Sequence, residues 1–293
     1  MKIIDPHLHL FDLNQGQYHW LKSQNPPFWP DKHLIAKNVT EADLLLSSPL
    51  TLDGFVHIEA GFNNQQPWRE IAWLEQTCQS NFRSIAMLDI TLAPAEFAEQ
   101  LKHLLTFKSV VGIRHILDEQ ALEILQHKYC LDNLKRLAAE QLCFELQFSL
   151  LDSPAVSYLI NNILPIDNLS FCLNHAGFPP IALESYTEKI SIWKDNLNQL
   201  SQFTNVYIKC SGYELFNNLC SRQFSRQDQQ NIINQCINSF GISRVMLASN
   251  FPLSTWQESY QSTWHANSEL AFSANELTQL CYRNAYQYYF SER

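Results

Sequence analysis

Short apolar segments rich in β-branched residues recur along the whole chain, each separated from the next by enough residues for a helix. Such segments predict strands, and they lie at residues 3–8, 54–59, 84–88, 110–114, 143–149, 169–173, 206–210 and 244–249. Apolar residues at helical spacing lie between them and predict helices at residues 67–79, 94–105, 130–141, 154–164 and 227–240. A further helix is expected at residues 273–290, where Ser273 and Glu276 have the pattern of a capping box.

The regular alternation of strands and helices determines the expected fold class. Strands joined by helices are parallel, with right-handed crossovers. Eight such units favour a closed (β/α)8 TIM barrel over an open doubly wound sheet. No repeat or interdomain linker interrupts the pattern, so residues 1–293 are expected to form one α/β domain. The irregular, aromatic-rich segment 12–53 is expected to be a long loop across the barrel mouth.

The first expected strand ends in two histidines. Strict alternation of side chains puts Asp5, His7 and His9 on one face of this strand. Ile4 then shares the other face with Leu8. Two imidazoles side by side at a strand end suit a metal ion, a water molecule or a substrate oxygen, and the pair alone does not choose among them.

Composition and charge exclude several classes of protein. The chain is 46% hydrophobic and 17% charged, as in an ordinary globular protein. Its net charge of -9 argues against a nucleic-acid partner, because phosphates select Lys and Arg patches. The N-terminus lacks a secretion signal, and no apolar run approaches the roughly 18 residues of a membrane span. Eight cysteines without a Cys-x-x-Cys pair indicate free thiols in a cytoplasmic protein. The oligomeric state is left open.

Polar side chains follow every one of the expected strands. In a barrel of this kind, catalytic groups lie at the C-terminal ends of the strands. The groups at these ends are His7, His9, Glu59, Asp89, Arg114, His115, Gln147, His175, Lys209 and Asn250. Because parallel strands end at the same rim, the pattern predicts a ring of polar groups around the barrel mouth.

These positions and their neighbours resemble the lactonase-like branch of the amidohydrolase superfamily (the amidohydrolase-2 group), described as predicted metal-dependent hydrolases of the TIM-barrel fold. The matching stretches are "IIDPHLHLFDL", "YHWL", "GFVHIEAG", "VVGIRHIL", "FCLNHAGFP", "NVYIKCSGY", "SRVMLASNFPL" and "NAYQYYF". They occur in family order and span nearly the whole chain, and the first, fifth and seventh are the most specific.

The resemblance implies a site at the barrel mouth. In the superfamily pattern, a His-x-His pair after the first strand and later histidines bind one or two metal ions, and an aspartate after strand eight activates the hydrolytic water. His7 and His9 match the pair, and His175 matches the histidine after strand six. Many relatives have aspartate where this chain has Asn250, in the stretch "SNFP".

Asn250 changes the chemistry that the resemblance implies. An amide can orient a water molecule but cannot accept its proton at neutral pH, and it is a poor metal ligand. The expected strand-five end offers Glu145 and Gln147 but no lysine that could be carbamylated to bridge two metals. The sequence therefore predicts either no required cofactor or a single divalent cation such as zinc, held by His7, His9 and His175.

Four residues are expected to contact the substrate: Arg114, Glu59, Gln147 and Trp20. Arg114 suits a substrate carboxylate, and its alternative role is an ion pair with a neighbouring carboxylate. Glu59 lines the mouth or caps the following helix. Trp20 belongs to a hydrophobic lid or packs the first loop onto the barrel. Buried Glu145 needs a partner, for which a histidine is the natural candidate.

The leading functional hypothesis is a hydrolase that opens a lactone ring of a small molecule, either a sugar-acid or an aromatic-degradation lactone. Water attacks the ring carbonyl, the three histidines polarise the carbonyl and shuttle protons, and Asn250 positions the water or the carbonyl. One alternative is a mononuclear zinc-dependent hydrolase or a decarboxylase of the same superfamily. An alternative of another class is a catalytically silent barrel that binds a metabolite.

Overall fold

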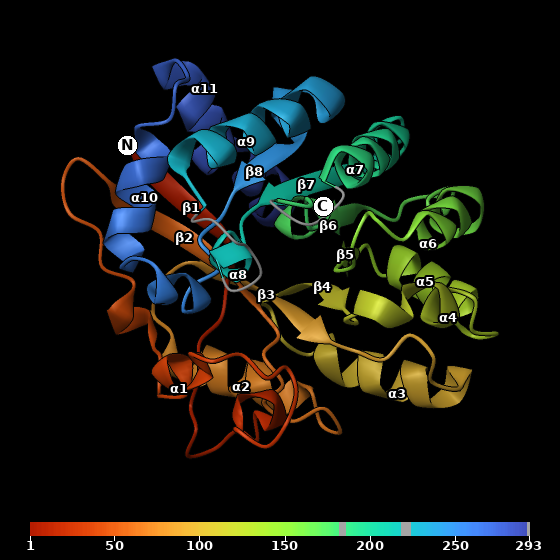
Figure 1. The fold of residues 1–293 in the computed structure, drawn as a ribbon. Helices are drawn as coiled ribbons and strands as arrows, with labels where there is room; N and C mark the ends of the chain where they lie inside the picture. Colours follow the sequence, from red (N-terminus) through yellow and green to blue (C-terminus); the bar gives the residue numbers. More distant parts are fainter. Residues whose placement is uncertain (182–185, 218–223, 292–293) are drawn as a thin grey trace.

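The chain folds into a barrel of parallel strands surrounded by helices (Figure 1). The computed structural model describes residues 1–181, 186–217 and 224–291. Within these residues, one sheet contains eight strands, each paired in parallel with the next along the chain. They are β1 (Lys2–Leu8), β2 (Thr51–Ile58), β3 (Phe82–Met87), β4 (Val110–Arg114), β5 (Cys143–Leu146), β6 (Phe171–Leu173), β7 (Val206–Cys210) and β8 (Val245–Leu247). This architecture confirms the expected (β/α)8 TIM barrel.

Helices lie between consecutive strands and cover the outside of the barrel (Figure 1). The α-helices are α1 (Lys32–Ile35), α2 (Trp68–Thr77), α3 (Pro94–Leu104), α4 (Ala121–Leu125), α5 (Cys130–Ala139), α6 (Ser153–Tyr158), α7 (Tyr186–Ser201), α8 (Glu214–Asn217), α9 (Arg226–Phe240), α10 (Tyr260–Ser268) and α11 (Ala274–Thr278). The 3-10 helices are η1 (His19–Leu21), η2 (Glu41–Asp43), η3 (Asp118–Gln120), η5 (His175–Gly177), η6 (Ile242–Arg244) and η7 (Leu253–Trp256). The π-helical turns are η4 (Leu159–Ile163), η8 (Gln279–Arg283) and η9 (Tyr286–Phe290). The expected capping box of Ser273 and Glu276 is confirmed at the start of α11.

Two expectations from composition can be compared with the structure. The seven cysteines within the described residues are free thiols, whereas Cys220 lies outside the described residues. In the described part of the chain, none of the helices has the length and apolar character that crossing a membrane requires.

The expected strands differ from the observed ones mainly at their ends. The fifth strand ends at Leu146, not at residue 149, because the Gln147 carbonyl turns away and accepts the backbone N–H groups of Leu117 and Asp118. The irregular segment 12–53 contains three short helices and rests on the chain that follows β2 and β8.

The barrel closes between its first and last strands through backbone hydrogen bonds. The N–H of Asn250 donates to the carbonyl of His7 at 2.9 Å, and the N–H of His9 donates to the carbonyl of Phe251 at 2.7 Å. Leu8 and Phe251 form a parallel bridge at the same place. Closure therefore brings the C-terminal end of β1 against the segment that follows β8.

A β-bulge in β1 changes which side chains face the barrel interior. The pairing with β2 shifts register between Asp5 and Leu8. Ile4 packs in the interior cluster, whereas Leu8 belongs to the outer core. The Asp5 carboxylate accepts the indole N–H of Trp264 on α10, outside the barrel. The expectation that Asp5 shares a face with the two histidines, and Ile4 with Leu8, is therefore wrong, because strict alternation ends at a bulge.

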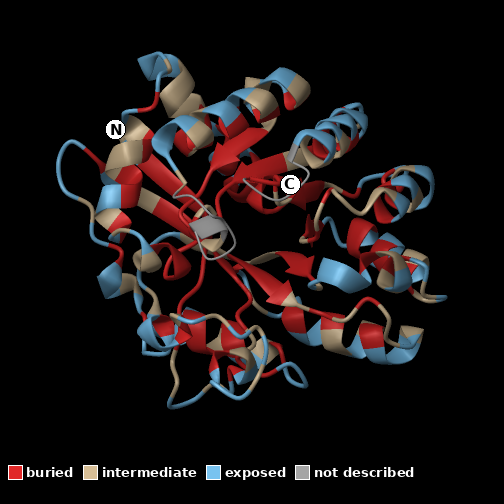
Figure 2. Ribbon diagram, viewed as in Figure 1, coloured by how far each residue is buried: buried red, intermediate tan, exposed pale blue. Residues whose placement is uncertain are grey.

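Apolar side chains from six strands and from the C-terminal segment pack together inside the barrel. Strands so far apart in the sheet meet only around the barrel axis. The cluster consists of Ile4, Val56, Ile58, Ile85, Cys143, Cys172, Met246, Ala285, Tyr288, Tyr289 and Phe290. Figure 2 shows the strands buried and the outer faces of the helices exposed.

A buried ion pair lies next to this interior apolar cluster. The ammonium group of Lys209 is 2.7 and 2.8 Å from the two carboxylate oxygens of Glu145, and both side chains are fully buried. The hydroxyl of Tyr289 and the side-chain amide of Asn174 donate to the same carboxylate. The expectation of a histidine partner for Glu145 is wrong, because Lys209 on β7 points into the barrel and satisfies it.

Breaking this pair should destabilise the barrel. Lys209→Met should lower the free energy of unfolding by about 3–5 kcal/mol, because Glu145 then becomes a buried charge without its cation. The double variant Lys209→Met/Glu145→Leu should lose less than Lys209→Met alone, since no unpaired charge remains. Urea denaturation of the three proteins measures this, and a double variant at least as unstable as the single variant would contradict it.

Candidate active site

Three histidines meet at the C-terminal mouth of the barrel. The imidazole centroids of His7 and His175 are 4.7 Å apart, and those of His7 and His9 are 5.2 Å apart. All three side chains are buried. The structure therefore brings together the pair from the end of β1 and the histidine after β6, as the sequence pattern predicts.

A backbone carbonyl determines the tautomer of His9. Its Nδ1 is 2.8 Å from the carbonyl oxygen of Ile58, and because a carbonyl only accepts, Nδ1 carries the proton and Nε2 has the lone pair. His57, in contact with His9, is satisfied otherwise: its Nδ1 accepts the backbone N–H of Leu10, and its Nε2 donates to Glu70 at 3.1 Å. His57 therefore has protein partners on both ring nitrogens.

His175 is held by a strained turn and by the close approach of a glycine. His175 and Ala176 both have a φ of 52°, in the left-handed region that residues other than glycine rarely adopt. The Nδ1 atom of His175 is 3.0 Å from the hydroxyl of Ser211. A Cβ atom at Gly212 would lie 2.6 Å from that same Nδ1. The turn after β7 therefore needs glycine so that the imidazole has room.

Two buried polar side chains at the mouth have atoms without a hydrogen-bond partner among the described residues. In His7 these atoms are the two ring nitrogens, and in Asn250 the atom is the side-chain oxygen. An unsatisfied buried polar group costs about 1–3 kcal/mol. Asn250 also has a φ of 56°, a second departure from relaxed geometry. Such groups are characteristic of sites that a ligand completes.

The three histidines are uncharged at neutral pH. Burial lowers the pKa of His7 and of His9 well below the usual value. Burial, followed by the positive charges of Arg114 and Lys209, lowers the pKa of His175 to about 3. A neutral imidazole donates one hydrogen bond and accepts another, so the cluster is suited to polarising a carbonyl group.

Glu214, at the start of α8, is a site residue that the sequence pattern misses. Its Oε1 accepts a hydrogen bond from the side-chain amide of Asn250, and the residue is only 4% exposed. The pattern of polar residues at strand ends selects Lys209, which lies on β7 itself. It does not select Glu214, which lies in the segment after β7. One signal was available: Glu214 comes directly after the family-like stretch "NVYIKCSGY".

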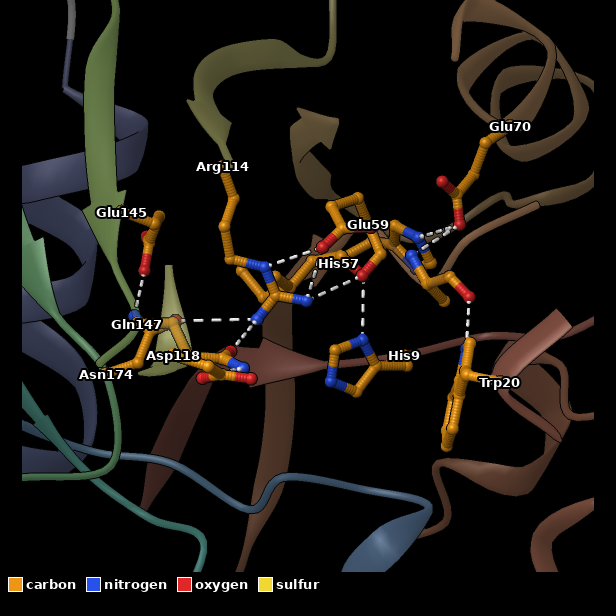
Figure 3. Close-up of polar contacts among 12 residues, drawn as sticks. His9, Trp20, His57, Glu59, Glu70, Arg114, Asp118, Glu145, Gln147 and Asn174 are labelled. Atoms are coloured by element: carbon orange, nitrogen blue, oxygen red, sulfur yellow. Dashed lines mark hydrogen bonds and ion pairs between the residues drawn. The ribbon is translucent and has the colours of Figure 1, made fainter. Parts of the chain in front are cut away.

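Arg114 has protein partners for all of its donors (Figure 3). Its Nε is 2.8 Å from the Glu59 carboxylate, and one terminal nitrogen contacts both that carboxylate at 2.7 Å and the Glu59 carbonyl at 2.8 Å. The other terminal nitrogen is 2.6 Å from Gln147 and 3.5 Å from Asn174. These contacts account for the five N–H groups of a guanidinium. The ion pair that the sequence left open is present, and a substrate carboxylate would have to displace one of these acceptors.

Of the other three expected substrate contacts, Glu59 and Gln147 directly follow β2 and β5, whereas Trp20 lies on η1 in the first loop. Glu59 is buried, with its carboxylate on the guanidinium group just described. Gln147 is half-buried and its amide oxygen accepts from that same group. Trp20 is half-buried and donates to the Ala60 carbonyl at 2.7 Å (Figure 3). It also packs against Trp29. Trp20 thus packs the first loop onto the barrel, one of the two roles considered from sequence.

The residues at the mouth do not fit a resident metal ion. Across residues 1–181, 186–217 and 224–291, no group of three or more His, Cys, Asp or Glu side chains is placed to hold one. Three neutral imidazoles can by themselves hold a zinc ion in other proteins, but the amide of Asn250 adds no negative charge, which lowers the affinity for a divalent cation relative to a carboxylate at that position.

Comparison with known proteins gives a match over nearly the whole chain. A family model described as "Amidohydrolase" matches residues 4–290. Among curated proteins, the uncharacterized protein y4mH of Sinorhizobium fredii is 26% identical over 304 aligned residues, which cover 98% of each chain.

Solved structures share the fold. An amidohydrolase from Burkholderia multivorans, solved with bound HEPES and also with bound zinc, is 18% identical, and in the HEPES form it has a TM-score of 0.78 with 99% of each chain covered. A probable 2-pyrone-4,6-dicarboxylic acid hydrolase from Acinetobacter baumannii, with citric acid bound, is 17% identical with a TM-score of 0.64 and 99% of each chain covered. At these identities the similarity shows the fold alone.

The close approach of Gly212 to His175 can be tested with a matched pair of glycines. Gly212 and Gly241 both have a φ of 75°, but a Cβ at Gly241 would meet nothing within 4 Å. Gly241→Ala should therefore lose about 1–3 kcal/mol of stability, from backbone strain alone. Gly212→Ala should lose clearly more, because its Cβ also displaces the imidazole. Urea denaturation measures both, and equal losses would show that the contact with His175 does not matter.

Proposed function

Because the chain belongs to the amidohydrolase family, we propose that it is a hydrolase that opens lactone rings by attack of water on the ring carbonyl. One observation carries this proposal: the uncharged imidazole of His7 and the side-chain oxygen of Asn250 are both buried at the mouth without partners among the described residues. The imidazole suits a carbonyl oxygen, and the amide oxygen suits a water molecule. We expect the lactone to be a sugar-acid lactone or one from aromatic degradation.

The reaction needs an oriented water molecule and a polarised carbonyl. The Asn250 oxygen accepts an O–H of the water, and an N–H of His7 donates to the carbonyl oxygen of the lactone. As the new C–O bond forms, negative charge develops on that oxygen and the imidazole N–H stabilises it. The ring C–O bond then breaks and the ring oxygen takes a proton, which yields the hydroxy acid. His9 and His175, held by Ile58 and Ser211, keep the cluster in place.

An ester-like carbonyl fits this donor set better than an amide does. Lactones are more reactive than amides, so their opening depends less on a strong Lewis acid. A 2-pyrone is itself an unsaturated cyclic ester, so the Acinetobacter protein that carries the name of a 2-pyrone hydrolase supports lactone opening on this fold.

We assign the surrounding residues to two roles. Arg114, with all of its donors engaged, positions Glu59 and Gln147 by charge and hydrogen bonding. Gln147 and Trp20 remain our candidates for contact with the rest of the substrate, because both are partly exposed where β5 and the first loop reach the mouth.

A lactone screen tests the proposal directly. The purified protein should release acid, detected with a pH indicator, from at least one of a panel of sugar-acid and aromatic-degradation lactones. Turnover should persist in chelator, because the imidazoles and the amide act without a metal. No turnover, with thermal stabilisation by a lactone, would support the silent metabolite-binding barrel. Stoichiometric zinc and loss of turnover in chelator would support the zinc-dependent hydrolase.

Replacing His7 should separate function from stability. His7→Leu should lower kcat at least about 100-fold, while the free energy of unfolding stays equal or rises, because two unsatisfied buried nitrogens are removed. The matched control is His57→Leu, which removes the N–H that His57 donates to the buried carboxylate of Glu70 and leaves that carboxylate the N–H of Ala60; it should cost about 1.5–3 kcal/mol. Steady-state kinetics and urea denaturation measure both effects. An active His7→Leu enzyme would remove His7 from the mechanism.

A further inference from the structure

The proposed hydrolysis lacks a proton acceptor at the end of β8. Attack by water requires that a proton leave the water oxygen, and the carboxamide of Asn250 cannot take it at neutral pH. We propose that Glu214 is the general base of this site, acting on the water molecule that Asn250 orients. This inference rests on the proposed function and adds the residue that receives the proton.

The position of Glu214 next to Asn250 is the geometric basis of the proposal. The Oε1 atom of Glu214 accepts the hydrogen bond of the Asn250 side-chain nitrogen, and both residues are buried. Because that nitrogen is turned toward Glu214, the amide oxygen is turned away from it, and that oxygen has no partner among the described residues. The proposal places the water molecule at the edge of this amide, where one O–H donates to the amide oxygen and the other donates to the Glu214 carboxylate.

The environment of Glu214 suits a base that works near neutral pH. Burial raises its pKa to about 7, opposed by hydrogen bonds from its own backbone N–H and from Asn250. Arg226 on α9 lines the same cavity but is paired with Glu258, so the two charges largely cancel. Two other titratable side chains of the described residues belong to this region: Tyr213, directly before Glu214, and Asp5, bound to Ser249. A base whose pKa lies near the working pH transfers protons most effectively.

A polar cavity connects Glu214 with the surface. The cavity has a volume of about 430 Å³ and is lined by Glu214, Ser249, Gln229, Arg226 and Glu258, among others. The side chain of Arg226 is 52% exposed, so this wall of the cavity reaches solvent. The histidines do not line the cavity. Glu214 therefore contacts Asn250 and also borders a polar route for water and protons to solvent.

The step balances without any further reactant. The water oxygen forms a bond to the lactone carbonyl carbon while one of its protons moves to the Glu214 carboxylate. The ring C–O bond then breaks, and the ring oxygen takes the proton back from Glu214 as it leaves. The product is the hydroxy acid, and Glu214 returns to its ionised form.

Glu214→Gln tests the assignment, because glutamine keeps an oxygen that accepts from Asn250 but cannot act as the base. The wild-type kcat/KM should rise with pH through a limb near pH 7, since Glu214 must be ionised. In Glu214→Gln, kcat should fall about 10²–10⁴-fold with KM within about threefold, and the limb near pH 7 should disappear. A variant with wild-type kcat or an unchanged limb would overturn the proposal.

Restoring a carboxylate at position 250 provides a second, independent test. The double variant Glu214→Gln/Asn250→Asp should recover at least about tenfold of the lost kcat, because aspartate can accept the proton from the same water. No recovery would mean that Glu214 acts by positioning Asn250, which would overturn its role as base. Glu258→Gln is the matched control, since it removes a carboxylate from the same cavity without touching Asn250. It should keep kcat and retain the limb, moved to lower pH because the charge of Arg226 is then unpaired.

Wild-type kinetics separate this proposal from the function on which it rests. If the wild-type protein opens no lactone, the proposed function fails and the base is tested without turnover. Infrared difference spectra of wild type and Glu214→Gln across pH then report the ionisation of Glu214. A carboxyl band that titrates near pH 7 supports a base poised for neutral pH. A band that titrates below pH 5 overturns it.

Discussion

Two backbone hydrogen bonds across the seam of the barrel determine where the chemistry of this protein takes place. They join His7 and His9 at the end of β1 to Asn250 and Phe251 after β8. Because the same residues close the barrel and supply the site, the site cannot shift without opening the sheet. The bulge in β1 adds to this constraint: it turns Asp5 outward to α10 while the histidines stay at the mouth.

The interior of the barrel contains charged side chains, whereas apolar side chains usually fill a barrel of this kind. The pair of Glu145 and Lys209 and the pair of Glu59 and Arg114 are linked through the amide of Asn174. A buried pair is balanced only while both partners and their hydrogen bonds remain. After burial, the positive charges of Arg114 and Lys209 also lower the pKa of His175. The two buried ion pairs therefore help to keep the imidazole at the mouth uncharged.

With an amide at position 250, a task that a single carboxylate can perform is divided between two residues. A carboxylate both orients water and accepts its proton. In our proposal the amide oxygen of Asn250 keeps the first task and Glu214 takes the second, from the loop after β7. The hydrogen bond between the two side chains holds them next to each other. The polar cavity beside Glu214 supplies the route to solvent.

The sequence by itself determined the order of strands and helices, the closed barrel and the gathering of the three histidines, because periodicity and strand ends are local properties of the chain. Only the tertiary structure decided which way Asp5 faces, because a single bulge reverses the alternation that a sequence pattern assumes. Tertiary contacts alone also decided that Arg114 is saturated by Glu59 and its neighbours and that Glu214 meets Asn250. These pairs are 55 and 36 residues apart in the chain, and no local pattern specifies which distant side chains a closed barrel brings into contact.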